Sequence, residues 1–155
     1  MINKIDKIYY YKLKKHYKYV LAKDFSIQTD IKGFDIKTKY IILNPDGLLT
    51  SLHDYAWDGA SGPAVDTITI LKASLVHDIL YQLIRMGLLP IYFKAYADKF
   101  LQDIYIKDCK YRKPNKLQLW FSNLRSKWIY FGVDKFGKSS VRPIQKEDIK
   151  IYEAP

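Results

Sequence analysis

The amino-acid sequence predicts an α+β fold, in which N-terminal antiparallel β hairpins pack with a C-terminal core of three helices. Two observations support this prediction. Segments that mix β-branched and aromatic residues with polar ones lie early in the chain, and stretches with apolar residues at helical spacing follow after residue 67. Strands first and helices later are typical of α+β proteins rather than of alternating parallel sheets. The 155 residues suffice for a single domain spanning 1–155.

The β region is expected at residues 17–54, after a basic N-terminal extension at 1–16. Extended segments are expected at 17–21 and 25–29, where aromatic and β-branched residues gather. The clearest hairpin signal is the sequence Asn44-Pro45-Asp46-Gly47, which separates two apolar segments. Proline presets φ for the second turn position, and glycine accepts a positive φ near the end of the turn.

The helical core is expected at 67–131, between a loop at 55–66 and a C-terminal tail at 132–155. Three helices are expected within it, at about 68–86, 91–108 and 115–131. Asp66 or Thr67 is the expected N-cap of the first helix, and Gly87 the expected stop.

The first helix is apolar around much of its circumference, so we expect it at the centre of the core. The second has an apolar face of Phe93, Ala97, Phe100, Leu101 and Ile104. Trp57, in the loop before the helices, is expected in the core or as an anchor of that loop. The third helix has an apolar stripe at helical spacing that we expect to face the core. The stripe consists of Leu117, Trp120, Phe121, Leu124, Trp128 and Phe131.

The charge is unevenly distributed along a chain whose net charge is +10. Residues 1–40 hold ten lysines against four aspartates, and residues 107–138 hold nine basic residues against two acidic ones, whereas 41–106 is net acidic. The basic ends favour anionic partners, namely nucleic acid, lipid headgroups or an acidic protein surface. The simpler explanation of the charge is solubility of a lysine-rich chain, and no nucleic-acid-binding motif is visible.

Several classes of protein are not expected from this sequence. The longest apolar runs are too short for a transmembrane segment, and the lysine-rich residues 1–19 do not resemble a secretory signal peptide. Cys109 is the single cysteine, so no internal disulfide forms. His53 follows the hairpin without an obvious partner.

The candidate catalytic residues are His77, Tyr81 and Asp98. His77 lies within the most apolar helix, with Tyr81 four residues later on the same face. The short connection between the first two helices predicts antiparallel packing, which brings Asp98 opposite His77. A carboxylate that accepts from one imidazole nitrogen leaves the other nitrogen free to take a proton from water.

The candidate metal ligands are Asp58, Gly59 and Asp78. Asp58 begins a glycine-rich loop whose backbone carbonyls can converge, and Asp78 is a costly charge in an apolar helix unless it is paired or binds a metal. Carboxylate and carbonyl oxygens are the ligands that calcium prefers. The alternative is a buried structural network in which Asp98 only locks His77 in place.

Four segments of the chain resemble an uncharacterised domain family of tailed bacteriophages, over roughly residues 17–140. The resemblance implies a phage protein, in the virion or the host cytoplasm, whose partners are other virion proteins, but it supplies no activity. The segments are Tyr55-Ala56-Trp57-Asp58-Gly59-Ala60-Ser61-Gly62-Pro63, a helix with His77-Asp78-Ile79-Leu80-Tyr81, Ala97-Asp98-Lys99-Phe100-Leu101 and Trp128-Ile129-Tyr130-Phe131-Gly132-Val133.

A more distant similarity is to the prokaryotic branch of secreted, calcium-dependent phospholipase A-two. There an Asp-Gly loop precedes a helix with His-Asp and Tyr, and a later helix has an Asp. The resemblance implies that His77 is a general base oriented by Asp98 and supported by Tyr81, and that Asp58, the Gly59 carbonyl and Asp78 bind calcium. Ala60 and Ser74 are not cysteines, so the disulfides that often brace those enzymes are missing. We therefore expect a calcium-dependent ester hydrolase acting on anionic lipid or, alternatively, a non-enzymatic virion component.

Overall fold

The computed structural model describes residues 7–12, 18–59, 68–112 and 114–137, and its strands form two small antiparallel sheets. The first sheet has the order β1-β2-β7, made of β1 (Tyr10–Lys12), β2 (Tyr19–Leu21) and β7 (Ala56–Trp57). Aromatic side chains meet on it, since the ring of Trp57 lies 5.3 Å from that of Tyr19 and 6.2 Å from that of Tyr10. β1 falls within residues assigned above to a basic extension.

The second sheet has the order β3-β6-β5-β4 and contains the predicted hairpin. Its strands are β3 (Phe25–Gln28), β4 (Ile36–Lys37), β5 (Ile41–Leu43) and β6 (Leu48–Ser51). The amide of Gly47 closes the turn on the carbonyl of Asn44 at 2.9 Å. Gly47 has φ +90°, and a Cβ there would collide with the Thr29 carbonyl, so the turn requires glycine.

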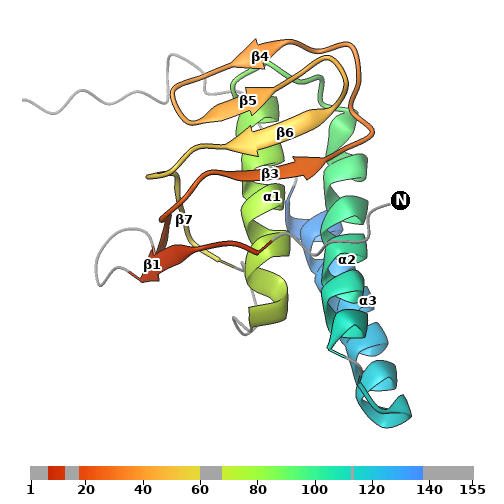
Figure 1. Ribbon diagram of the computed structural model, residues 1–155. Helices are drawn as coiled ribbons and strands as arrows, with labels where there is room; N and C mark the ends of the chain where they lie inside the picture. Colours follow the sequence, from red (N-terminus) through yellow and green to blue (C-terminus); the bar gives the residue numbers. More distant parts are fainter. Residues whose placement is uncertain (1–6, 13–17, 60–67, 113, 138–155) are drawn as a thin grey trace, which may run out of the picture.

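Three helices follow, and Figure 1 shows them beside and behind the sheets. They are α1 (Ile68–Arg85), α2 (Phe93–Tyr111) and α3 (Lys116–Phe136), and α2 packs against both others. Gly87, whose φ is +72°, stops α1 as predicted, with the paired backbone hydrogen bonds of a Schellman motif. Asn115 caps α3 in a reciprocal capping box with Gln118. The predicted N-caps of α1, Asp66 and Thr67, lie outside the described residues.

The α+β prediction is confirmed, and α1 is the central helix of the core. Its described apolar side chains are buried on every face, as its sequence predicts. The first sheet is fixed to it by polar contacts at β7, since the Tyr55 hydroxyl donates to Gln82 Oε1 at 2.9 Å and the Trp57 indole donates to Ser74 Oγ at 3.3 Å. The predicted inner face of α2 is buried at Ala97, Leu101 and Ile104 and half-buried at its two phenylalanines.

The prediction for α3 is wrong in orientation. The six apolar side chains expected in the core are all exposed, Trp128 to 68%. α3 contacts the protein through its opposite face, where Ser126 and Ile129 are buried. Trp57 is in the core as expected, whereas Trp120 is not. α3 also continues to Phe136, beyond the expected end at 131.

Within the described ranges, none of the helices combines the length and the apolar character that a bilayer crossing requires. The single cysteine, Cys109, is buried near the end of α2.

Candidate functional site

The candidate site lies where α1 and α2 pack side by side. His77 Nε2 is 2.9 Å from Asp98 Oδ1, so the short connection between the helices brings these residues together as predicted. His77 has only 8% of its side chain exposed and Asp98 has none. A buried carboxylate is costly in free energy unless it is paired and hydrogen-bonded, so Asp98 requires hydrogen-bond partners.

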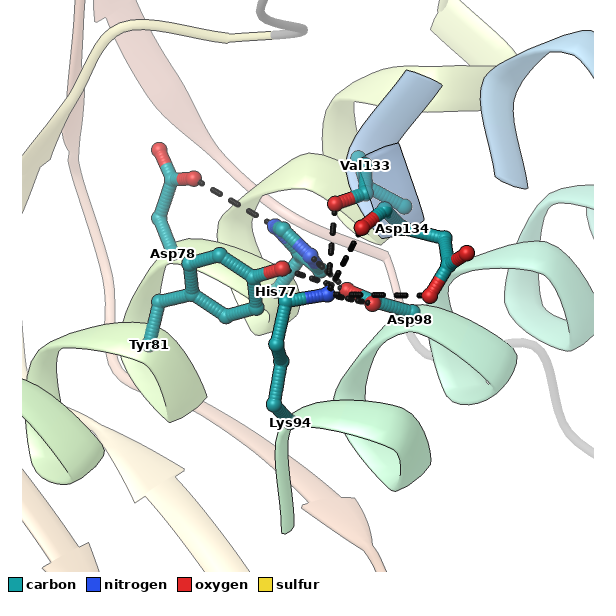
Figure 2. A network of polar contacts seen from close by, with 7 residues as sticks. All are labelled: His77, Asp78, Tyr81, Lys94, Asp98, Val133 and Asp134. Atoms are coloured by element: carbon teal, nitrogen blue, oxygen red, sulfur yellow. Dashed lines mark hydrogen bonds and ion pairs between the residues drawn. The ribbon is translucent and has the colours of Figure 1, made fainter. Parts of the chain in front are cut away.

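Asp98 accepts hydrogen bonds from three side chains (Figure 2). The Tyr81 hydroxyl donates to Oδ1 at 2.6 Å, beside the His77 nitrogen. Lys94, which lies one helical turn before Asp98 on α2, donates from Nζ to Asp98 Oδ2 at 2.6 Å. Lys94 was missed in the sequence, although its spacing of four residues from Asp98 is a recognisable ion-pair signal on a helix.

Lys94 also joins the site to the C-terminal end of α3. Its ammonium donates to the Val133 carbonyl at 3.3 Å and to the Asp134 carbonyl at 3.5 Å, and it lies 4.0 Å from the Asp134 carboxylate. The Val133 carbonyl also accepts from the Gly137 amide at 2.8 Å, and because the last carbonyls of a helix carry partial negative charge, they suit an ammonium group. Gly137 follows against Tyr81, where an added Cβ would collide with the tyrosine hydroxyl.

The contacts shift the pKa values of the site in defined directions. Burial alone would raise the pKa of Asp98, but the hydrogen bonds from His77, Lys94 and Tyr81 outweigh burial and lower it. Burial alone would lower the pKa of His77, but the neighbouring Asp78 and Asp98 carboxylates outweigh burial and raise it. Burial and the Asp98 charge together raise the pKa of Tyr81, which stays a hydroxyl donor.

The second ring nitrogen of His77 is directed toward Asp78. His77 Nδ1 lies 3.8 Å from Asp78 Oδ1, beyond hydrogen-bond length, and the Asp78 side chain is 30% exposed (Figure 2). One ring nitrogen therefore contacts the fully buried Asp98, and the other is directed toward the partly exposed Asp78. This is the arrangement in which one carboxylate orients an imidazole whose other nitrogen can exchange a proton.

The predicted metal ligands are only partly brought together. Burial and the negative charge of Asp58 raise the pKa of Asp78, so the two carboxylates are close enough to repel each other. Asp58 is exposed, and Gly59 is buried with φ +79°. Among the residues that the structure describes, no group of three or more His, Cys, Asp or Glu side chains is arranged to hold a metal ion. The rest of the glycine-rich loop, from Ala60 onward, lies outside them.

A second histidine has a carboxylate partner that the sequence did not reveal. His53 Nδ1 lies 2.9 Å from Asp24 Oδ1, and the His53 amide donates to the same oxygen at 2.8 Å. The two residues are separated by 29 positions, and both side chains are more than half exposed. The hydrogen bond that the His53 ring donates to the Asp24 carboxylate raises the pKa of His53. This exposed pair is a natural comparison for the buried one.

We compared the chain with protein-family models, with curated proteins and with solved structures, and none of the three comparisons found a match.

Proposed function

We propose that this protein is an ester hydrolase in which His77 acts as the general base on water. The observation that supports it is the orientation of the imidazole, with Nε2 on Asp98 at 2.9 Å and Nδ1 without a contact of hydrogen-bond length among the described residues. A base of this kind needs one nitrogen for the water proton and a carboxylate on the other to stabilise the imidazolium that forms.

Each neighbouring residue has a role in this proposal. Asp98 is a positioning residue that holds the ring of His77 and stabilises its charged form. Tyr81 and Lys94 in turn hold Asp98, since each donates to it at 2.6 Å. Their hydrogen bonds keep Asp98 ionised, which is the state that favours proton uptake by His77.

Calcium is the proposed cofactor, held by Asp58, the Gly59 carbonyl and Asp78. The donor set is all oxygen, and the repulsion between the two carboxylates is what a cation would relieve. Calcium takes six to eight oxygen ligands, so further carbonyls or waters have to complete the site. When bound, it would polarise an ester carbonyl and stabilise the resulting oxyanion.

The proposed substrate is an ester of an anionic membrane lipid. Its support is the similarity of the Asp58-Gly59 loop and the His77-Asp78 helix to phospholipase A-two, together with the net charge of +10. From the resemblance to a tailed-phage domain family, we further propose that the hydrolase acts in a virion or in infected host cytoplasm.

The test is fatty-acid release from phosphatidylglycerol vesicles with calcium present. His77→Ala should abolish release, whereas His53→Ala should leave it unchanged, because His53 has an equally short carboxylate contact but is exposed. Circular dichroism spectra of both variants serve as the control that each is folded. A chelator should stop the reaction, and Asp78→Asn should raise the calcium concentration that it requires. Absence of turnover by the wild-type protein on lipid and soluble esters would refute the proposal.

A second candidate function is a structural component of a phage particle. The observation that favours it is the row of exposed apolar side chains on α3, which a neighbouring subunit would cover. Mass spectrometry of purified particles tests it. A fixed copy number in the particle would support it, and absence from particles would exclude it.

A further inference from the structure

Half of the exposed large apolar side chains among the described residues, six of twelve, lie on the outward face of α3. The exposed large apolar side chains of this helix fall on one side of it, opposite the buried Ser126 and Ile129. At 100° per residue they occupy an arc of about 100°. We call this set the α3 face, and its members are Leu117, Trp120, Phe121, Leu124, Trp128 and Phe131.

Basic residues border this face on both sides. At the same angular spacing, Lys116 and Lys127 lie along one border and Arg125 along the other, with Lys135 beyond its C-terminal end. The only acidic residue of α3 is Asp134, which lies 4.0 Å from Lys94. The α3 face is therefore a strip of aromatic and aliphatic groups within a positively charged border.

The fold leaves this strip accessible. The joined ends of α2 and α3 project beyond the end of α1 and away from the sheets (Figure 1). Tyr111, at the end of α2, is 67% exposed beside this projection, and Lys110 and Arg112 add positive charge there. The strip and its basic border thus continue onto the tip of the helix pair.

We infer that the α3 face docks onto the surface of an anionic lipid bilayer. A helix with tryptophan, phenylalanine and leucine on one side and lysine and arginine along its borders lies in the bilayer interface, where the rings enter the headgroup boundary and the basic chains reach the phosphates. Tryptophan is enriched at that depth because its ring is apolar and its N–H remains polar.

The charge distinguishes this occupant from a second copy of the chain. Two copies joined through the α3 face would bring the basic borders of both helices, with Lys116, Lys127 and Arg125, into one interface, and Asp134 is the only acidic residue that either helix could set against them. Like charges opposed across an interface are unfavourable. An anionic bilayer instead matches both the apolar strip and its border.

Binding is measured by co-sedimentation with vesicles of phosphatidylglycerol and phosphatidylcholine in equal parts, and with pure phosphatidylcholine. A chelator is present, so the result does not depend on the proposed hydrolysis. The wild-type protein should bind the anionic vesicles and lose binding in high salt. Trp120→Ser/Trp128→Ser should weaken binding at least about tenfold, because two rings leave the bilayer. Ile91→Ser/Tyr92→Ser is the matched control, since those side chains are equally exposed but lie off α3.

The basic border is tested by Lys116→Glu/Lys127→Glu. Each basic residue near an anionic surface contributes about fivefold, so this variant should bind at least about 25-fold more weakly. Lys32→Glu/Lys37→Glu makes the same charge change on exposed residues of the second sheet region and should have a much smaller effect. Brominated lipid should quench wild-type fluorescence but not that of the Trp120/Trp128 variant, whose remaining Trp57 is buried.

Three results would overturn the inference. One is no binding of folded wild-type protein to anionic vesicles. Another is equal loss of binding in the α3 variants and their matched controls. The third is a dimer in analytical ultracentrifugation that Trp120→Ser/Trp128→Ser dissociates, which would assign the α3 face to a second copy of the chain.

Discussion

Replacing Asp98 with asparagine tests the centre of the candidate site by removing one charge from a fully buried position. Asp98 accepts from His77, Tyr81 and Lys94, and its side chain has no exposed surface. Asparagine keeps the shape but removes the carboxylate charge at 2.6 Å from the Lys94 ammonium, which is only 12% exposed and whose remaining carboxylate, Asp134, lies at 4.0 Å. Breaking a buried ion pair by removing one partner typically costs about 3–5 kcal/mol, so we expect a loss of that size in the free energy of unfolding at pH 7.

The pH dependence of this loss follows from the direction of the pKa shift. The pKa of Asp98 is lowered in the folded state, so between the folded value and the ordinary unfolded value of about 3.9 the unfolded chain binds more protons. The contribution of Asp98 is therefore fully present above that window and disappears as the pH falls through it. The difference between wild type and Asp98→Asn should shrink from pH 5 toward pH 3.

Asp108 offers a control of opposite sign on the same pair of helices. It forms an ion pair with Lys72 at 2.7 Å, but burial outweighs this contact and raises its pKa. The folded state then binds more protons at this position, so the contribution of Asp108 falls as the pH rises through about 4 and above. The advantage of wild type over Asp108→Asn should thus decrease with rising pH, whereas its advantage over Asp98→Asn should increase.

Urea unfolding followed by circular dichroism at pH 3, 4, 5 and 7 measures both variants against wild type. Equal slopes with urea concentration confirm that the same surface is exposed on unfolding. A loss below about 1 kcal/mol for Asp98→Asn at pH 7, or the same pH trend for both variants, would refute the account of Asp98 as a buried charge held by three donors.

Two further changes test neighbouring contacts. Gly137→Ala should destabilise the protein by about 1–3 kcal/mol, because the added methyl collides with the Tyr81 hydroxyl. Gly132→Ala is the control and should not destabilise it, because a Cβ added there meets no atom within 4 Å. Equal urea midpoints for the two variants would contradict the close packing of Gly137 against Tyr81. In an NMR titration His53 should have a midpoint above 6.5, and Asp24→Asn should lower it, because the carboxylate stabilises the protonated ring; an unchanged midpoint would exclude that contact in solution.

The sequence predicted the pairing of His77 with Asp98 because two local signals determine it. One is the short connection at Gly87 that makes α1 and α2 antiparallel, and the other is the similar distance of both residues from that connection. Lys94 was within reach of the same reasoning, since it lies one helical turn before Asp98. The Asp24–His53 contact was not, because it depends on how two loops distant in the chain meet.

The inverted orientation of α3 shows what apolar periodicity can and cannot predict. Residues that recur every three or four positions define a face of a helix, but the pattern does not say what covers that face. The inner side of α3 includes Ser122, Ser126 and Ile129, and the two small serine side chains allow the helices to approach closely. α2 therefore packs against the less apolar side of α3, and Trp120 and Trp128 are left outside. Because large exposed apolar surfaces are unfavourable in water, their position on α3 indicates an external surface that buries them, and vesicle binding tests whether that surface is lipid.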